Sequence, residues 1–282
     1  MVDKYGLIKA AQLIAQSDGL LIAAGAGMGV DSGLPDFRGN DGFWKSYPAL
    51  QSSGVDFREM ASPSQFWSAP RMAWGFYGHR LALYRRTQPH AGFGILRQIA
   101  AKLPGQAFVY TSNVDGQFQK AGFSELRMHE CHGSIHHLQC MNRCRQSTWP
   151  ADAFEPLVDQ QACRLLNDLP VCPHCGGLAR PNVLMFNDME WVPARAEQQR
   201  ERLESWLQQV RSPVVVELGA GTAVPTVRSF GASQGLPFIR INIRDAYVRP
   251  SLQRVSLAMG ALPALEEIHA ALADSGFFRP VA

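Results

Sequence analysis

Residues 20–39 read LLIAAGAGMGVDSGLPDFRG, an apolar run that passes into a loop with glycine at positions 25, 27, 29, 33 and 39. The apolar run is typical of a strand that is buried on both faces of a sheet. Glycines after such a strand let the backbone approach a phosphate closely, and the N–H groups of a following helix favour its charge. The loop therefore suits a dinucleotide, although G-A-G-x-G does not match G-x-G-x-x-G and glycines alone also fit an ordinary turn.

The end of this stretch strengthens the dinucleotide interpretation. Pro35 stiffens the turn, and the next three residues place an acid, an aromatic ring and a cation beside the expected phosphate site. Few purely structural turns need these three side chains together. We therefore predict that this loop contacts a cofactor through Gly25, Ala26, Gly27, Asp36, Phe37 and Arg38.

Composition and charge exclude several classes of protein. The 282-residue chain is 46% hydrophobic and 18% charged, with a net charge of only +3. It lacks the strong basic stripe of a dedicated nucleic-acid binder, so no nucleic-acid partner is expected. Its apolar runs are shorter than the ~18 residues that a membrane span needs, and its first residues do not have the layout of a signal peptide. We expect a cytoplasmic protein with no membrane partner.

Short apolar segments recur along the chain, at residues 107–113, 180–186, 212–221 and 236–242, separated by helical or turn-rich stretches. This alternation predicts a mostly parallel sheet with helices on both faces. Two intervals interrupt it. Residues 43–87 are rich in Trp, Phe, Tyr and Arg and indicate short helices, and residues 131–179 contain cysteine pairs and little periodicity.

We therefore predict an α/β fold with a Rossmann-like, mostly parallel sheet and a smaller inserted domain. Residues 1–42, 88–130 and 180–282 are assigned to the large, dinucleotide-binding domain. The helical insertion 43–87 and the zinc-binding insertion 131–179 together form the small domain.

Four of the six cysteines form two close pairs, which in a reducing compartment favours a metal site over disulfides. Four thiolates give Zn²⁺ a closed tetrahedral shell with no position left for a substrate, so the zinc is expected to be structural. The predicted ligands are Cys140, Cys144, Cys172 and Cys175. Cys131 and Cys163 are the obvious substitutes, and buried thiols without a metal are the alternative.

Five motifs, in order, resemble those of the sirtuins, the NAD-dependent protein deacylases. The first loop is similar to the family's G-A-G-x-x-x-x-S-G-x-P-D-F-R-G. T-S-N-V-D at 111–115 is similar to T-Q-N-I-D, and H-G-S at 132–134 to H-G-S. R-P-N-V-L-M-F at 180–186 is similar to R-P-x-V-x-F-G-E, and I-N at 241–242 to an adenosine-side asparagine. The matches cover most of the chain.

The resemblance implies a protein-lysine deacylase that uses NAD and releases nicotinamide and O-acyl-ADP-ribose. It makes His132 and Asn113 the catalytic residues: His132 is the general base on the ribose hydroxyls, and Asn113 holds the ribose side. A base that titrates near neutrality suits this task, since unperturbed histidine has a pKa of about 6.5. Asp115 is expected to bind the carboxamide of nicotinamide, although an Asx turn at the end of the strand also explains Asn113 and Asp115. Further cofactor contacts are implied for Ser112, Gly219, Ala220, Gly221, Thr222 and Asn242.

A second resemblance concerns the acyl group. Tyr77 and Arg80 lie three residues apart, so on a helix they share a face and can hold one group together. They resemble the Y-x-x-R of the sirtuin branch that removes succinyl and other acidic acyl groups, and Ala61 stands where that branch keeps a small residue. Phe186, in the R-P-x-V motif, is the fourth residue assigned to the substrate. In the alternative, Tyr77 is a packing residue and Arg80 a solvated surface cation.

The chain also departs from the family pattern. Ser112 replaces a glutamine, Gly29 replaces a serine, and residues 187–190 replace the F-G-E turn that pairs with the substrate peptide. These changes affect the expected substrate, acylated lysine in a protein, more than the use of NAD. There are two competing hypotheses. One is a mono-ADP-ribosyltransferase or NAD glycohydrolase on the same scaffold, and the other is a noncatalytic NAD-sensing or protein-binding module.

Overall fold

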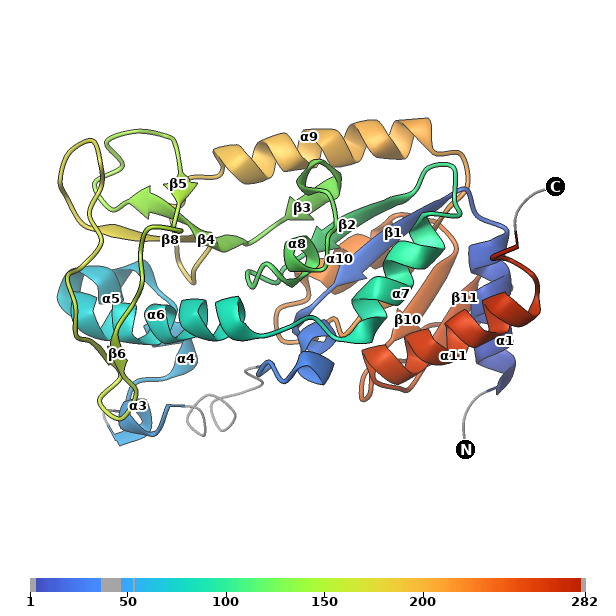
Figure 1. Ribbon diagram of the computed structural model, residues 1–282, viewed down its shortest axis with the longest axis horizontal. Coiled ribbons are helices and arrows are strands. Elements are labelled where there is room, and N and C mark those ends of the chain that lie inside the picture. Colours follow the sequence, from blue (N-terminus) through green and yellow to red (C-terminus); the bar gives the residue numbers. More distant parts are fainter. Residues whose placement is uncertain (1–3, 37–46, 53, 280–282) are drawn as a thin grey trace.

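The computed structural model describes residues 4–36, 47–52 and 54–279 (Figure 1). Their largest sheet is parallel throughout, with strand order β11-β10-β9-β1-β2-β3. The strands are β1 (Gly19–Ala24), β2 (Ala107–Thr111), β3 (Met128–Glu130), β9 (Pro213–Leu218), β10 (Phe238–Ile241) and β11 (Arg254–Leu257). The predicted α/β class and parallel sheet are confirmed. No helix of the described residues is both long and apolar enough to cross a bilayer.

One strand lies in a different sheet from the one predicted. The apolar segment 180–186 gives β8 (Ala179–Val183), which pairs antiparallel with β4 (Gly133–Cys140) and not with the parallel sheet. The same small sheet contains β5 (Trp149–Pro150). The prediction that this segment joins the main sheet was wrong, because an apolar run reveals that a strand is buried but not which strand it pairs with. The short strands β3 and β11 were not predicted.

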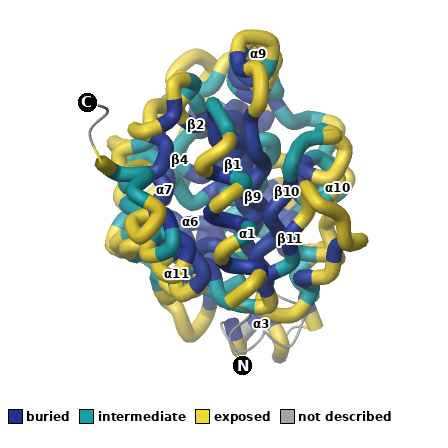
Figure 2. The backbone as a smooth tube through the Cα atoms, turned by 90° about the vertical axis from the view of Figure 1, so that its right-hand side faces the viewer, coloured by how far each residue is buried: buried dark blue, intermediate teal, exposed yellow. Residues whose placement is uncertain are grey.

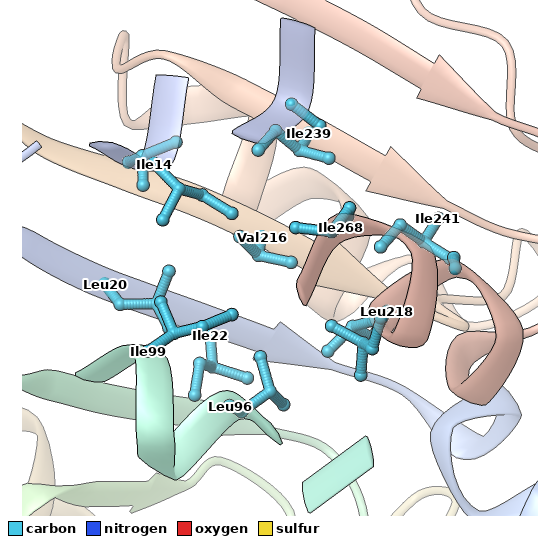
Figure 3. Close-up of a cluster of buried hydrophobic side chains, with 14 of the residues drawn as sticks. Ile14, Leu20, Ile22, Leu96, Ile99, Val216, Leu218, Ile239, Ile241 and Ile268 are labelled. Carbon is cyan, nitrogen blue, oxygen red and sulfur yellow. The ribbon is translucent and has the colours of Figure 1, made fainter. Parts of the chain in front are cut away.

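Helices cover both faces of the parallel sheet. Alternate residues of β1 point to opposite faces, so Leu20 and Ile22 pack on one side and Leu21 on the other. The first side is covered by α1 (Lys4–Ala15), α7 (Ala91–Ala100) and α11 (Ala261–Asp274), whose Ile14, Leu96, Ile99 and Ile268 appear in Figure 3. The second side is covered by α9 (Ala194–Gln209) and α10 (Thr226–Ser233). The strands β1, β2, β3, β9 and β10 are consequently buried along their whole length, as Figure 2 shows for β1 and β9, whereas the edge strand β11 is partly exposed.

The two predicted insertions share a second hydrophobic cluster. The helical segment gives α3 (Pro48–Ser52), α4 (Phe57–Met60), α5 (Pro63–Ser68) and α6 (Pro70–Arg86). Buried Phe66 and Trp74 from these helices pack in one cluster with Ile135 and Leu138 of β4. The hairpin β6 (Val158–Asp159) and β7 (Arg164–Leu165) lies against α6. The helices of 43–87 and the residues of 131–179 are thus packed together, and the domain boundaries given above stay a prediction.

The glycines after β1 have a structural cause in the neighbouring strand. Gly25 N donates to Leu218 O at 2.9 Å, and Gly27 N donates to Gly219 O at 3.0 Å. A Cβ atom on Gly27 would lie 2.6 Å from the Cα of Gly219, which itself has a φ of +59°. The loops after β1 and β9 therefore touch backbone to backbone, with no room for a side chain between them.

This contact predicts the stability of two alanine variants. Gly27→Ala should lower the free energy of unfolding by about 1–3 kcal/mol, because the new methyl group meets backbone that cannot move aside. Gly221→Ala is the matched control, since a Cβ at Gly221 meets no atom within 4 Å. Urea denaturation followed by circular dichroism measures both. Equal midpoints for the two variants would show that the loops do not constrain each other in this way.

Candidate active site

Hydrogen bonds join the end of β2 and the loop after it to the end of β1 and the loop after that strand. Thr111 Oγ1 donates to Ala24 O at 2.8 Å and accepts a hydrogen bond from Asn113 N at 3.0 Å. Asn113 Nδ2 donates to Gly25 O at 3.0 Å. Two residues predicted to bind the cofactor, Gly25 and Asn113, therefore lie together at the carboxyl edge of the sheet. This is the edge where open parallel sheets bind their ligands.

Asp115 begins a turn into the short helix α8 (Gln117–Lys120). Its Oδ1 accepts a hydrogen bond from Gln117 N at 2.9 Å, which is the Asx turn of the structural alternative. Its carbonyl oxygen lies 2.9 Å from His136 Nε2. Burial, assisted by the nearby Glu130, raises the pKa of Asp115 to about 6. A carboxyl group that titrates near neutrality is a common feature of binding and catalytic sites.

His132 follows β3 at the same edge. Its backbone is fixed, because its carbonyl oxygen accepts from Leu184 N at 2.9 Å. Its Nε2 lies 3.3 Å from Thr226 Oγ1 at the start of α10. Burial lowers the pKa of His132 below the usual 6.5, so the imidazole is neutral at physiological pH. Thr226 was missed by sequence analysis, because only the fold brings α10 to this histidine.

Glycine after His132 has a steric reason. Gly133 has a φ of +76°, and a Cβ atom there would lie 2.0 Å from Asn182 O on β8. The H-G of the H-G-S motif is thus a histidine followed by the residue that lets β4 approach β8. The glycine sets the direction in which the chain leaves the histidine.

The loop after β9 is partly open. Ala220 O accepts from Asn242 Nδ2 at 2.9 Å and from Arg228 Nη1 at 3.1 Å. Asn242 Oδ1 accepts from Arg244 N and Asp245 N, both at 3.1 Å, so both ends of this buried amide already bind the chain's own backbone. Residues 222–224 are exposed, and Gly221 faces open space. This loop can accept a ligand at its exposed residues, whereas Asn242 shapes the loop.

For the other residues predicted to contact the cofactor, the structure shows fewer interactions. Ser112 N donates to Ala24 O at 3.3 Å, so this residue lies where the ends of β1 and β2 are hydrogen-bonded to each other. Asp36 is half-buried after the first loop. Phe37 and Arg38 lie outside the described residues.

The residues predicted to hold the acyl group are buried in the second cluster. Arg80 is only 8% exposed, so the solvated-cation alternative is wrong. Its Nε donates to the hydroxyl of Tyr84 at 2.9 Å, and its guanidinium lies over the ring of Tyr77, 5.7 Å from the centroid. Burial raises the pKa of Tyr77 to about 12, so its phenol keeps its proton and remains a donor. Tyr84 was not predicted, although its i+4 spacing from Arg80 places it on the same helix face.

Ala61 and Phe186 meet through their backbones. Phe186 N donates to Ala61 O at 2.9 Å, and the Phe186 ring packs edge-on against Phe57 at 5.9 Å between centroids. Two of the predicted substrate residues are thus joined across α4 and the segment after β8.

The segment that replaces F-G-E is built around a buried ion pair. Arg180 binds Asp188 with two hydrogen bonds of 2.8 Å, and both side chains are fully buried. Asp188 Oδ1 also accepts from Glu190 N at 3.1 Å. A bidentate pair of this kind fixes the turn, since either charge alone would be buried without compensation.

The four predicted zinc ligands come together. One sulfur atom from each lies within 4.8 Å of the other three, with 3.6 Å between Cys140 and Cys175 and 3.5 Å between Cys144 and Cys172. These distances exceed the ~2.05 Å of a disulfide bond. They approach the ~3.8 Å between sulfurs on a tetrahedral zinc with Zn–S bonds of about 2.3 Å. The cluster therefore fits a structural zinc ion, and Cys131 and Cys163 are outside it.

A sequence model of the Sir2 family matches residues 25–210, which contain the first loop, Asn113, His132 and all four zinc ligands. The chain belongs to the Sir2 family. The resemblance to the sirtuins is thereby confirmed, and NAD is the cofactor of this family.

Curated relatives extend the comparison. A Thermococcus kodakarensis protein named NAD-dependent protein deacylase is 29% identical over 86% of each chain. An Aquifex aeolicus protein of the same name is 30% identical over 60% of this chain and 62% of its own length. The dog protein named NAD-dependent protein deacylase sirtuin-5, mitochondrial, is 29% identical over 63% of this chain and 58% of its own.

Solved Sir2 structures share the fold. A Sir2 homologue in complex with ADP-ribose has a TM-score of 0.71 at 24% identity, covering 97% of this chain and 99% of the other. A Sir2 homologue in complex with NAD has a TM-score of 0.71 at 23% identity, with 95% and 94% covered. This Sir2 chain therefore has the fold of those proteins along nearly its whole length.

The cysteine cluster generates a prediction for the metal. Purified protein should contain about one zinc per chain, and Cys144→Ser should reduce both the zinc content and the melting temperature. Cys131→Ser and Cys163→Ser are the matched controls and should keep the metal. Elemental analysis by mass spectrometry measures zinc in all four proteins. Zinc-free wild-type protein, or loss of zinc in a control variant, would contradict the four-thiolate site.

Proposed function

We propose that this chain removes acyl groups from lysine side chains of proteins, with NAD as the co-substrate. The observation that carries the proposal is the position of His132, a neutral, half-buried imidazole at the edge where the loops after β1 and β2 are fastened together. The names of the curated relatives support the same activity. Residence in the cytoplasm stays a prediction.

The residues at this edge fit a dinucleotide. The exposed residues 222–224 lie in the loop after β9, at the carboxyl edge of the sheet. Asp115, with its raised pKa, is assigned to the carboxamide of nicotinamide, and Asn113 to the ribose side. When bound, NAD supplies a ribose–nicotinamide bond that breaks with a neutral leaving group, so an amide oxygen is a sufficient nucleophile.

His132 then acts as the base. In a neutral imidazole one nitrogen donates and the other accepts, and Thr226 Oγ1 near Nε2 orients the ring. With Nε2 donating to Thr226, Nδ1 is the nitrogen that takes the proton from a hydroxyl. Hydrolysis of NAD, or transfer of ADP-ribose to another acceptor, does not require a base on the ribose hydroxyls. A placed, neutral His132 therefore favours deacylation over these alternatives.

His132→Ala should lower kcat for deacylation by about 10²–10⁴-fold while NAD still binds. The substitution removes the general base but leaves intact the loops after β1 and β9, which are assigned to NAD binding. His269→Ala, at a histidine on α11 that bonds Gln98, is the matched control and should retain activity. Release of nicotinamide and O-acyl-ADP-ribose from acetyl-lysine and succinyl-lysine peptides measures activity. Nicotinamide release that does not depend on peptide would favour the glycohydrolase.

The same residue determines the expected pH dependence. Because burial lowers the pKa of His132, the neutral base persists to a lower pH, and kcat should fall only below pH 6.5. Asp115 also titrates near 6, so the profile is repeated with Asp115→Asn at saturating NAD to isolate the histidine. An acidic limb with its midpoint above 6.5 in both proteins would contradict a buried, neutral base.

We further propose that the acyl group is acidic and that Arg80 binds its carboxylate. The support is a buried guanidinium beside the protonated phenol of Tyr77, two donors suited to one carboxylate. Deacetylation remains part of the proposal, since a shorter acyl group does not need these donors.

Arg80→Met should lower kcat/KM for desuccinylation by about 10- to 150-fold, because a hydrogen bond to a charged group is lost, and change deacetylation little. Arg86→Met, at an exposed arginine near the end of α6, is the matched control. Both rates are measured on one peptide sequence carrying either acyl group. Equal losses on the two peptides would remove the argument for an acidic acyl group.

A further inference from the structure

A second concave site lies away from the residues assigned to NAD. It is a pocket of about 200 Å³ between the end of α10, the strands β10 and β11, and the segment 247–249. Strands β10 and β11 lie at one edge of the parallel sheet (Figure 1). Pockets that bind drug-sized molecules typically measure ~300–1,000 Å³, so this smaller pocket has room only for a small ligand.

The pocket and the candidate active site lie toward opposite ends of the strands. Phe238 and Arg254, at the first residues of β10 and β11, line the pocket. Asn242 and Gly219, assigned to NAD, follow the last residues of β10 and β9. Since these strands are parallel, the pocket lies toward their amino ends and the dinucleotide surface at their carboxyl ends.

The floor of the pocket is apolar, and the exposed aromatic ring of Tyr247 lies at its rim. Leu236, Phe238 and Val248 are lining residues, with Phe238 and Val248 buried. Tyr247 at the rim is 76% exposed, an unusual position for a large aromatic side chain. A flat apolar ligand would cover this ring and the floor together, which removes apolar surface from water.

The charge around the pocket is positive. Arg240 is compensated, because its Nη2 binds Glu217 Oε2 at 2.9 Å. Arg249 and Arg254, both exposed lining residues, have no carboxylate oxygen within 4 Å among the described residues. Two guanidinium groups are thus available to an anion at the mouth.

We propose that this pocket binds a small amphipathic anion, with an aromatic or branched apolar body on the Phe238 floor and a carboxylate or phosphate head between Arg249 and Arg254. The guanidinium fork suits either head group, because it donates two parallel hydrogen bonds. The inference does not depend on the deacylase activity, since binding alone tests it.

The probe is 2-naphthoate, titrated into the full chain by calorimetry, with neutral 2-naphthamide as the matched ligand. We expect saturable one-to-one binding, with the amide at least about fivefold weaker because a charge-assisted hydrogen bond is lost. No saturable binding below about 10 mM, or equal affinities for the acid and the amide, would overturn the proposal.

Protein variants locate the site. Arg249→Gln and Arg254→Gln should each weaken binding at least about threefold, and Ala232→Trp, which fills the pocket, should abolish it. Arg211→Gln, at an exposed arginine between α9 and β9, is the control and should leave binding unchanged. If the tryptophan variant does not fold, the two arginine variants still decide the question.

A titration in saturating NAD completes the test. Because the pocket lies away from the carboxyl edge, NAD should leave a naphthoate site fully available. Competition by NAD, or unchanged binding in both arginine variants, would place the anion elsewhere and overturn the inference.

Discussion

The backbone contact between the loops after β1 and β9 determines where the rest of the candidate site can lie. Gly27 N bonds to Gly219 O, and the two loops leave no space for a side chain between them. The contact brings the carboxyl ends of two adjacent parallel strands to one place. Asn113, in the loop after β2, donates a hydrogen bond to Gly25 O, so the carboxyl end of β2 is held at the same place. The glycines after β1 thus hold the carboxyl ends of these strands together, in addition to the phosphate contact predicted for them.

Two of the functional assignments depend on burial. His132 is neutral and Asp115 titrates near 6 for the same reason, because the edge removes both side chains from water. Burial raises the pKa of an acid and lowers the pKa of a base. It therefore brings the pKa of Asp115 close to neutral pH and keeps His132 unprotonated. Two groups with such pKa values suit proton transfer and carboxamide binding near pH 7.

Sequence reasoning reached the parallel sheet, the cysteine cluster and the family because each leaves a local pattern. Short apolar runs predict buried strands, paired cysteines predict a metal, and short motifs keep their order. It failed where the information is in the pairing of distant segments. β8 is an apolar run like the others, yet it pairs with β4, and Thr226 reaches His132 only because α10 crosses the sheet. The cofactor role of Asn242 stays a prediction, and the sequence did not reveal that its amide binds three backbone groups.

The departures from the family pattern have physical consequences in this chain. Where the family has F-G-E, this chain has Asp188, which neutralises the buried Arg180 of the R-P motif. A charge buried in this way must be paired, so the turn after β8 is held by an ion pair and its neighbouring hydrogen bonds. Phe186, immediately before that turn, donates a backbone hydrogen bond to Ala61 at the end of α4. The replacement is thus linked through the backbone to Ala61, a residue of the proposed acyl pocket, so we expect it to affect substrate choice more than NAD use.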